Sequence, residues 1–352
     1  MAVELRKVTR RVGAETHIYE TSLALEPGQF NILLGTTLSG KTTLMRLMAG
    51  LEKPTTGEIW FNGANVTGVA VQKRSVAMVY QAFINYPNFT VYENIASPLK
   101  VGGLPANEIR EKVGEIAELL QLSPMLDRRP DELSGGQQQR TALARALVKG
   151  AELVLLDEPL ANLDYKLREE LRDELPKLFA DTGATVVYAT SEPLEALMLG
   201  GNTAVLSCGR LVQYGKTAQV YRAPDNLESS RVFSDPPLNI ASVTKRGDML
   251  ELSDTVTWRA PPALASMQDG EYTLGIRPHH LLPKGQGVQV NGEVQISEIS
   301  GSESIIRLTV EGNNWVSESH GVHAYEVGES AEFSFDENRC LYFDQDEHYI
   351  SL

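Results

Sequence analysis

The chain has 352 residues, 42% of them hydrophobic and 22% charged, so it can bury a sizeable core and has room for two domains. Its net charge of −14 and pI near 5.0 argue against a nucleic-acid partner, which a basic surface would bind. Two cysteines give no disulfide framework, and neither a signal peptide nor a membrane-spanning run is expected, so we predict a cytoplasmic protein that reaches a membrane only through a partner.

The N-terminal part of the chain predicts strands that lead into a glycine-containing loop. Segments 3–8 and 21–25 predict antiparallel strands, and 30–34 predicts a short buried strand. Residues 35–42 read GTTLSGKT and match the pattern G-x-x-x-x-G-K-[ST], and 42–49 carries apolar residues at helical spacing. Backbone N–H groups of such a loop and the helix N-terminus bind phosphate. We therefore expect a bound nucleotide, with Lys41 on its β- and γ-phosphates and the Thr42 hydroxyl on Mg²⁺.

The next segments alternate between strands and helices. Segment 57–63 predicts a short strand closed by an Asn-Gly turn, and 76–80 predicts a strand that ends at Gln81. Apolar residues between Ile109 and Leu120 form one stripe of a helix. Alternation of this kind, with continuous apolar runs in the strands, is typical of an α/β fold with a largely parallel sheet.

A second helix start with unusual residues follows. Ser134 is placed as the N-cap of a helix that opens with Gly135, Gly136 and Gln137. A serine-capped helix start that contains two glycines can bind an anion. One chain does not need two such sites for a single triphosphate.

Two carboxylates end the strongly apolar strand 153–157. Asp157 is suited to hold Mg²⁺ through water, and Glu158 is the candidate general base for the attacking water. An Asp-Glu-Pro sequence can also be a plain polar turn, but the phosphate loop and the Ser134 segment favour the catalytic interpretation. Beyond these carboxylates we expect a helix over 167–179, with Pro176 inside it, and a strand over 185–189.

Past Asp235 the pattern changes to short alternating segments such as 289–296 and 304–310, separated by turn residues. They predict a small all-β barrel or sandwich. We therefore expect a first domain over 1–235 and a second over 236–352.

These motifs together resemble the ATPase subunits of ATP-binding-cassette (ABC) transporters. In that family Gln81 is the Q-loop glutamine, Leu133 to Gln137 is the signature, Leu153 to Glu158 is Walker B and Asn162-Leu163-Asp164 is the D-loop. The segment Gly275-Ile276-Arg277-Pro278-His279 is similar to one in the regulatory domain of sugar-importer ATPases of the maltose type. The resemblance implies a P-loop nucleotide-binding domain with a helical subdomain, followed by a small OB-like regulatory domain.

The family also implies ligands, partners and a location. ATP and Mg²⁺ would be bound in a head-to-tail dimer, each ATP lying between one subunit's phosphate loop and the other's signature. Mg²⁺ would be held by Thr42, Gln81 and Asp157, and Gln81 and Glu158 would act in catalysis. Gln81 and region 83–98 would receive a helix of one of two permease subunits, at the cytoplasmic face of the bacterial inner membrane, with a periplasmic solute-binding protein as an indirect partner. Met78, Phe83, Tyr86 and Phe89 would line the docking groove, although these four could equally be core residues. The expected nucleotide-binding residues are Gly35, Thr36, Thr37, Leu38, Ser39, Gly40, Lys41, Thr42, Thr43, Ser134, Gly135, Gly136, Gln137 and Asp164.

Three departures from the family pattern fall in this chain's own nucleotide site. Leu38 stands where the loop usually carries another glycine, and Val12 where an aromatic residue stacks on adenine, a role that His17 or Tyr19 could fill. Ser191 replaces the switch histidine that contacts the γ-phosphate, and its hydroxyl cannot carry an imidazole's charge.

These departures lead to the hypothesis of a slow site in a heterodimer. The chain would bind ATP, hydrolyse it slowly and complete a competent site on a second, different ATPase. With Thr36-Thr37-Leu38 in the loop and Glu192-Pro193 after the replaced histidine, such a paired, unequal ATPase is similar to one ATPase subunit of bacterial glycerol importers. A homodimeric ATPase of a sugar or glycerol 3-phosphate importer and an ATP-bound regulatory scaffold remain alternatives.

Overall fold

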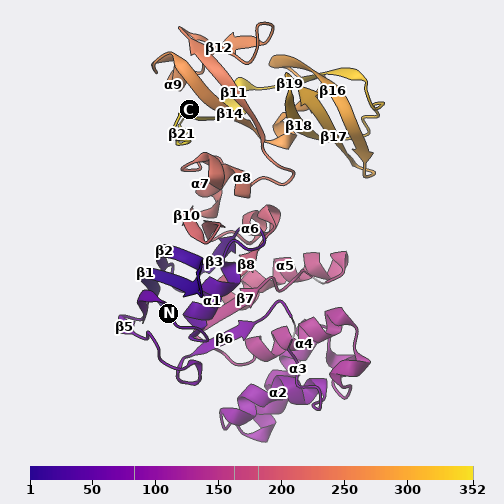
Figure 1. Ribbon diagram of the computed structural model, residues 1–352. Coiled ribbons are helices and arrows are strands. Elements are labelled where there is room, and N and C mark those ends of the chain that lie inside the picture. Colours follow the sequence, from indigo (N-terminus) through magenta and orange to yellow (C-terminus); the bar gives the residue numbers. More distant parts are fainter. Residues whose placement is uncertain (83, 162, 181, 352) are drawn as a thin grey trace. The chain divides into compact units, whose positions relative to one another are not determined.

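The computed structural model describes residues 1–82, 84–161, 163–180 and 182–351, which form two compact units, Met1–Ala218 and Gln219–Leu352 (Figure 1). The first unit is built on a six-stranded sheet with the order β10-β9-β3-β8-β7-β6. Neighbouring strands from β9 to β6 are parallel, and β10 is an antiparallel edge. The strands are β3 (Phe30–Leu34), β6 (Val76–Val79), β7 (Leu153–Asp157), β8 (Thr185–Thr190), β9 (Asn202–Ser207) and β10 (Arg210–Lys216).

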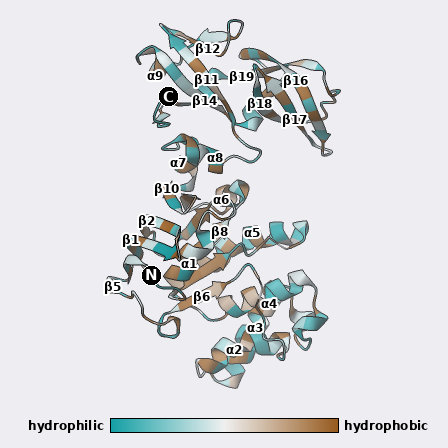
Figure 2. Ribbon diagram, in the orientation of Figure 1, coloured by the Kyte–Doolittle hydropathy of each residue, from teal (hydrophilic) through white to brown (hydrophobic). Residues whose placement is uncertain are grey.

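The expected parallel sheet is thus confirmed, and burial explains its apolar runs. Every residue of β3, β7 and β8 is buried, as for strands covered on both faces. These strands are among the most hydrophobic parts of the ribbon in Figure 2. Because the strands are parallel, the carboxyl ends of β3, β7 and β8 meet at one edge, which places the segments after Leu34, Asp157 and Thr190 together.

A second sheet of the first unit is antiparallel, with the order β2-β1-β4-β5. Its first two strands form the expected antiparallel pair but are longer than predicted. Apolar residues of β1 and β2 share one core with α1 and the parallel sheet, which fixes the hairpin beside the phosphate loop. The strands are β1 (Val3–Val12), β2 (Glu15–Leu25), β4 (Thr56–Phe61) and β5 (Ala64–Asn65).

Helices complete the first unit. In α3 the residues Ile109, Val113 and Ala117 are buried, which confirms the predicted stripe. The group α2, α3 and α4 lies together at one end of the unit in Figure 1 and forms the helical subdomain. The helices are α1 (Lys41–Ala49), α2 (Val91–Val101), α3 (Ala106–Leu119), α4 (Gly135–Leu147), α5 (Tyr165–Ala180) and α6 (Pro193–Leu199), and α7 (Thr217–Arg222) crosses from the first unit to the second.

The second unit consists mainly of two antiparallel sheets, which agrees with the expected β-rich domain. Their orders are β13-β12-β11-β14-β20-β21 and β15-β19-β16-β17-β18. The sheets share a core in which Trp258 and Trp315 both meet Phe335 edge to face, with ring centroids 5.5 and 6.4 Å apart. The elements are α8 (Leu227–Val232), β11 (Asn239–Arg246), β12 (Met249–Glu251), β13 (Thr257–Arg259), α9 (Pro262–Ala265), β14 (Gly270–Ile276), β15 (Leu282–Pro283), β16 (Val288–Ile299), β17 (Glu303–Val310), β18 (Asn313–His320), β19 (Ser330–Phe335), β20 (Leu341–Phe343) and β21 (Tyr349–Ile350).

The division after Ala218 lies earlier in the chain than the expected boundary near Asp235. The helix α8 accounts for the difference, because Leu227 packs against Leu341 and Phe343 of the second unit. The buried Arg277 also donates hydrogen bonds to the carbonyl of Tyr221, at 2.6 Å, and to that of Phe233. The helical pattern of this segment continues that of the first unit, so only tertiary contacts could assign it to the second.

Candidate functional site

The loop between β3 and α1 has the geometry of a phosphate cradle. It ends at Gly40, whose φ of 102° is a conformation that glycine adopts much more readily than other residues. A Cβ at this position would lie 2.7 Å from the side chain of Ile18. Gly35 is packed just as closely, since a Cβ would lie 2.4 Å from the carbonyl oxygen of Leu206. The loop is therefore held tightly from outside, with its N–H groups and the start of α1 at the carboxyl edge of the sheet.

Lys41 lies folded back into this loop. Its ammonium donates to the carbonyl oxygens of Gly35, at 2.7 Å, and Thr36, at 3.0 Å, and lies 3.6 Å from a carboxylate oxygen of Glu158. Burial lowers the pKa of Lys41, and the charge of Glu158 partly opposes this. A buried ammonium held by loop carbonyls beside the carboxylates of Glu158 and Asp157 is suited to bind a phosphate anion.

Oxygen ligands for a magnesium ion lie next to this lysine. The Thr42 hydroxyl donates to Oδ1 of Asp157 at 3.1 Å, and Asp157 is almost fully buried at the end of β7. Burial raises the pKa of Asp157, and the hydrogen bond from Thr42 offsets part of the rise. A hydroxyl and a carboxylate are the hard oxygen donors that Mg²⁺ prefers, so these residues fit the ion.

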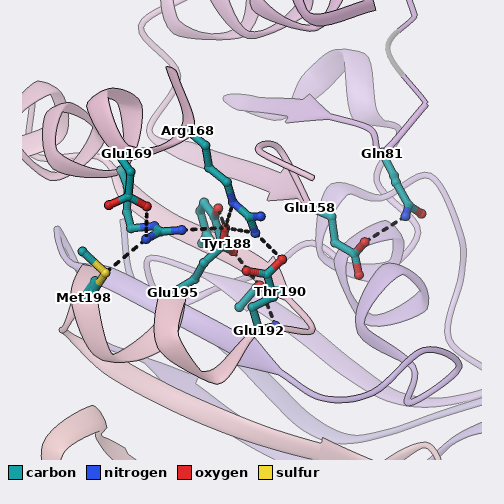
Figure 3. Close-up of polar contacts among 10 residues, drawn as sticks. Gln81, Glu158, Arg168, Glu169, Tyr188, Thr190, Glu192, Glu195 and Met198 are labelled. Carbon is teal, nitrogen blue, oxygen red and sulfur yellow. Dashed lines mark hydrogen bonds and ion pairs between the residues drawn. The ribbon is translucent and has the colours of Figure 1, made fainter. Parts of the chain in front are cut away.

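The two predicted catalytic residues Gln81 and Glu158 are in contact. Nε2 of Gln81 donates to Oε2 of Glu158 at 2.8 Å, and Figure 3 shows this pair pointing toward each other from two loops. Glu158 has a backbone φ of 46°, a left-handed conformation that is unfavourable for glutamate. Its N–H donates to the carbonyl oxygen of Ala189 at 3.0 Å, which holds it in that conformation.

A pocket of about 550 Å³ opens at this loop. The predicted nucleotide-binding residues 37–43 all line it, together with Gln81 and Glu158. Gly35 and Thr36 contribute through the carbonyl groups that hold Lys41. Residues that the sequence did not predict complete the walls, namely Glu15, Thr16, Cys208 and Gly209.

His17 is the ring that could stack on the nucleotide base. Among the described residues that line the pocket, it alone has a ring face. Val12, which stands at the family's aromatic position, is about half exposed and does not line the pocket. The ring of Tyr19 is covered by the guanidinium of Arg210, 3.7 Å from its centroid.

Cys208 and Gly209 form the turn between β9 and β10 and lie against the phosphate loop. The Gly209 N–H donates to the carbonyl of Ser39 at 3.0 Å, and its carbonyl accepts from the N–H of Tyr19 at 2.9 Å. A Cβ at Gly209 would lie 2.4 Å from the carbonyl oxygen of His17. A glycine after a strand is only a weak sequence signal of a functional role. Nothing in the local sequence around Gly209 indicates that it contacts the phosphate loop, which lies far away in the chain.

Leu38 keeps the backbone conformation that a glycine would adopt. Its φ is 68°, and its side chain is 94% exposed at the mouth of the pocket. A leucine in the left-handed region costs about 1–2 kcal/mol relative to a right-handed conformation. The expected strain is therefore present, whereas the expected bulk projects into solvent.

Ser191 follows β8 and is exposed, outside the residues that line the pocket. Its neighbours are tightly held: the Thr190 hydroxyl donates to Glu195 at 2.6 Å and accepts from the N–H of Glu192 at 3.0 Å. Arg168 on α5 pairs with both Glu192 and Glu195, as Figure 3 shows.

The signature residues lie away from this pocket, at the start of α4. Ser134 caps the helix by accepting from the N–H of Gln137 at 3.4 Å, and Gln137 accepts in return from the N–H of Ser134 at 3.0 Å. Ser134 and Gly135 are exposed, so the helix N-terminus is accessible. Within the described part of the chain, no α4 residue lines the pocket.

The remaining predicted residues are only partly described. Phe83 of the expected permease-binding region and Asn162 of the expected D-loop lie outside the described residues. Asp164 accepts the N–H of Arg168 through its carbonyl at 2.9 Å. Tyr86 and Phe89 are exposed with ring centroids 5.3 Å apart, while Met78 packs against the core.

None of the helices in the described ranges is both long and apolar enough to cross a bilayer.

The N-terminal unit matches the family model described as ABC transporter over residues 18–161, and the C-terminal unit matches the TOBE domain over 274–343. The chain is 38% identical to the trehalose/maltose import ATP-binding protein MalK of Thermococcus litoralis, over 97% of each chain.

Two further relatives and a solved structure are similar. The xylose/arabinose import ATP-binding protein XacK of Haloferax volcanii is 37% identical, over 93% of this chain and 88% of its own length. The osmoprotective compounds uptake ATP-binding protein GgtA of Synechocystis is 34% identical over 98% of each chain.

The dimeric post-hydrolysis structure of the ATP-binding cassette MJ0796 bound to ADP and Pi is 30% identical with a TM-score of 0.56, over 61% of this chain and 98% of that chain. The phosphate loop, the two carboxylates and the glutamine thus occur in a chain that the import ATP-binding proteins named above match over 93% of its length or more. This chain belongs to the importer-type ABC transporter ATPases that carry a C-terminal TOBE domain.

Proposed function

We propose that this chain is one of two non-identical ATPase subunits of a bacterial importer for a small polyol, most simply glycerol, and that its own site binds MgATP but hydrolyses it slowly. Its family membership supports the ATPase of a sugar or osmolyte importer. The relatives named above import sugars or osmoprotective compounds, so a small polyhydroxylated solute fits their range.

The roles in the site follow from its contacts. Thr42, Asp157 and Gln81 would hold Mg²⁺, and Lys41 would leave the carbonyls of Gly35 and Thr36 to bind the β- and γ-phosphates. Glu158, 2.8 Å from Gln81, would take the proton of the attacking water. Mg²⁺ supplies charge stabilisation of the phosphates when it is bound.

The observation that carries the slow-site proposal is Ser191. Ser191 is exposed after β8, outside the residues that line the pocket, and serine cannot supply the charge or the proton relay of an imidazole. Leu38 adds a strained backbone to the phosphate loop. Lys41, Thr42 and Asp157 are intact and lie together at the phosphate loop, so hydrolysis would be affected more than ATP affinity.

The intact signature supports the second half of the proposal. The exposed, serine-capped start of α4 has the properties of an anion site and lies outside this chain's own pocket. It would complete the site of the partner ATPase. The exposed Tyr86 and Phe89 would bind a permease helix, which would place the protein at the cytoplasmic face of the inner membrane.

The unequal sites can be tested in the assembled transporter. Glu158→Gln in this chain should lower ATP turnover of the complex only slightly, whereas the matching change in the partner should remove most of it. Ser191→His should raise turnover at least several-fold if the missing imidazole limits the rate. Equal losses from the two glutamate changes would contradict the asymmetry.

The solute needs a separate test, because the ATPase does not touch it. A deletion strain should lose uptake of labelled glycerol, and Lys41→Ala should fail to restore the uptake where the wild-type gene succeeds. Uptake of labelled maltose in the same strain serves as the control. Normal glycerol uptake in the deletion strain would remove the substrate assignment and leave the ATPase assignment intact.

A further inference from the structure

A buried carboxylate lies behind the strand end that supports the site. Glu195 on α6 is 3% exposed, and its side chain accepts hydrogen bonds from the hydroxyls of Tyr188, at 3.1 Å, and Thr190, at 2.6 Å. Its charge is balanced by Arg168 of α5, whose Nε and Nη2 lie 3.2 and 3.0 Å from Oε1. Arg172 is the next cation, 4.0 Å from the same oxygen.

This cluster fixes the carboxyl end of β8, on which two parts of the site rest. The carbonyl of Ala189 accepts the N–H of Glu158, and the carbonyl of Thr190 accepts the N–H of Gly35 at 3.3 Å. None of the residues of the cluster lines the pocket. Figure 3 shows Arg168, Glu195 and Thr190 grouped together, apart from the pair Gln81 and Glu158.

The two supported parts differ in what else holds them. Gly35 is also fixed by the close approach of Leu206 and by Lys41, which binds its carbonyl. Glu158 has a left-handed φ of 46°, and a strained conformation persists only where the surrounding structure enforces it. Loosening the end of β8 should therefore displace Glu158 more than it displaces the phosphate loop.

We propose that Arg168 is a positioning residue for hydrolysis: through Glu195 and Thr190 it fixes the strand end that keeps Glu158 in place. It sets the rate of the chemical step and leaves the affinity for ATP nearly unchanged. The inference rests on the proposed role of Glu158 as general base, but not on the polyol assignment or on the asymmetry of a dimer.

The first measurement separates rate from binding. In the assembled transporter, Arg168→Ala should lower the single-turnover rate of ATP hydrolysis at this chain's own site roughly tenfold to a hundredfold, the scale of a small displacement of a catalytic group. The dissociation constant of MgATP should stay within about twofold, because the binding residues keep their contacts. Arg168→Lys should recover part of the rate.

A matched change tests which of the two carboxylate partners of Arg168, Glu192 or Glu195, is needed for the rate. Glu192→Gln removes only the half-exposed partner and should change the rate less than about twofold. Thr190→Val removes the hydroxyl that donates to Glu195 and should repeat the loss of rate seen for Arg168→Ala. It also keeps the inference testable if Arg168→Ala does not fold, which thermal unfolding would reveal.

A double-mutant cycle decides whether Arg168 acts through Glu158. With Glu158→Gln already present, adding Arg168→Ala should cause no further loss of rate. Independent, multiplying losses would overturn the inference while leaving the base assignment intact, and so would an equal fall in rate and ATP affinity in Arg168→Ala alone. No loss of rate in Glu158→Gln alone would overturn both.

Discussion

Leu38 allows the strain in the phosphate loop to be tested by one substitution, Leu38→Gly. Its φ of 68° costs a leucine about 1–2 kcal/mol, and a glycine adopts this conformation freely. Because the side chain is 94% exposed, its removal forfeits almost no burial. Glycine adds roughly 0.5–1 kcal/mol of entropy to the unfolded chain. The difference is a stabilisation of about 0.5–1 kcal/mol.

The assay is urea denaturation of the nucleotide-free, full-length protein, followed by circular dichroism. Leu38→Gly should move the midpoint of the first unit's transition upward at an unchanged m-value. Leu38→Ala is the matched control, because it removes the apolar side chain and keeps the Cβ, and it should leave the midpoint nearly unchanged. A stabilisation of the same size in both variants would refute the backbone argument, and a destabilised Leu38→Gly would refute it as well.

Two other predictions concern the walls of the same pocket. His17→Ala should weaken ATP binding fivefold or more by loss of a base-stacking surface, with unchanged binding of inorganic tripolyphosphate, whereas Val12→Ala should change neither, as calorimetric titrations can show. Equal weakening of both ligands would remove the base-stacking role. Asp157→Asn should raise the thermal midpoint of the magnesium-free protein at neutral pH. The fold raises the pKa of Asp157, so ionisation of this carboxyl costs stability as pH rises through that pKa. The gain should fade as pH falls through it, since the carboxyl is then neutral, and a pH-independent gain would contradict this cause.

Much of the site was predictable because its chemistry lies in contiguous segments. The loop 35–42 and the pair Asp157–Glu158 each follow a buried apolar run, and parallel strands bring such ends to one edge. The signature segment was recognisable for a similar reason, because a helix N-cap is a local feature.

Contacts between distant segments were beyond the sequence. The selection of His17 over Val12 and Tyr19 depends on how the β1–β2 hairpin packs beside the loop and on Arg210, which covers one ring. Gly209 enters the site only because the β9–β10 turn lies against Ser39. The assignment of α8 to the second unit depends in the same way on the packing of Leu227.

The sequence by itself determined the parallel sheet, the phosphate loop, the two carboxylates and the β-rich second domain, because residue type and spacing encode them locally. Tertiary structure alone decided which ring lines the pocket, that Ser191 is not among the lining residues, and what holds Glu158 in its strained conformation. The physical reason is that these depend on hydrogen bonds and packing between residues far apart in the chain, such as Glu158 to Ala189 and Arg168 to Glu195.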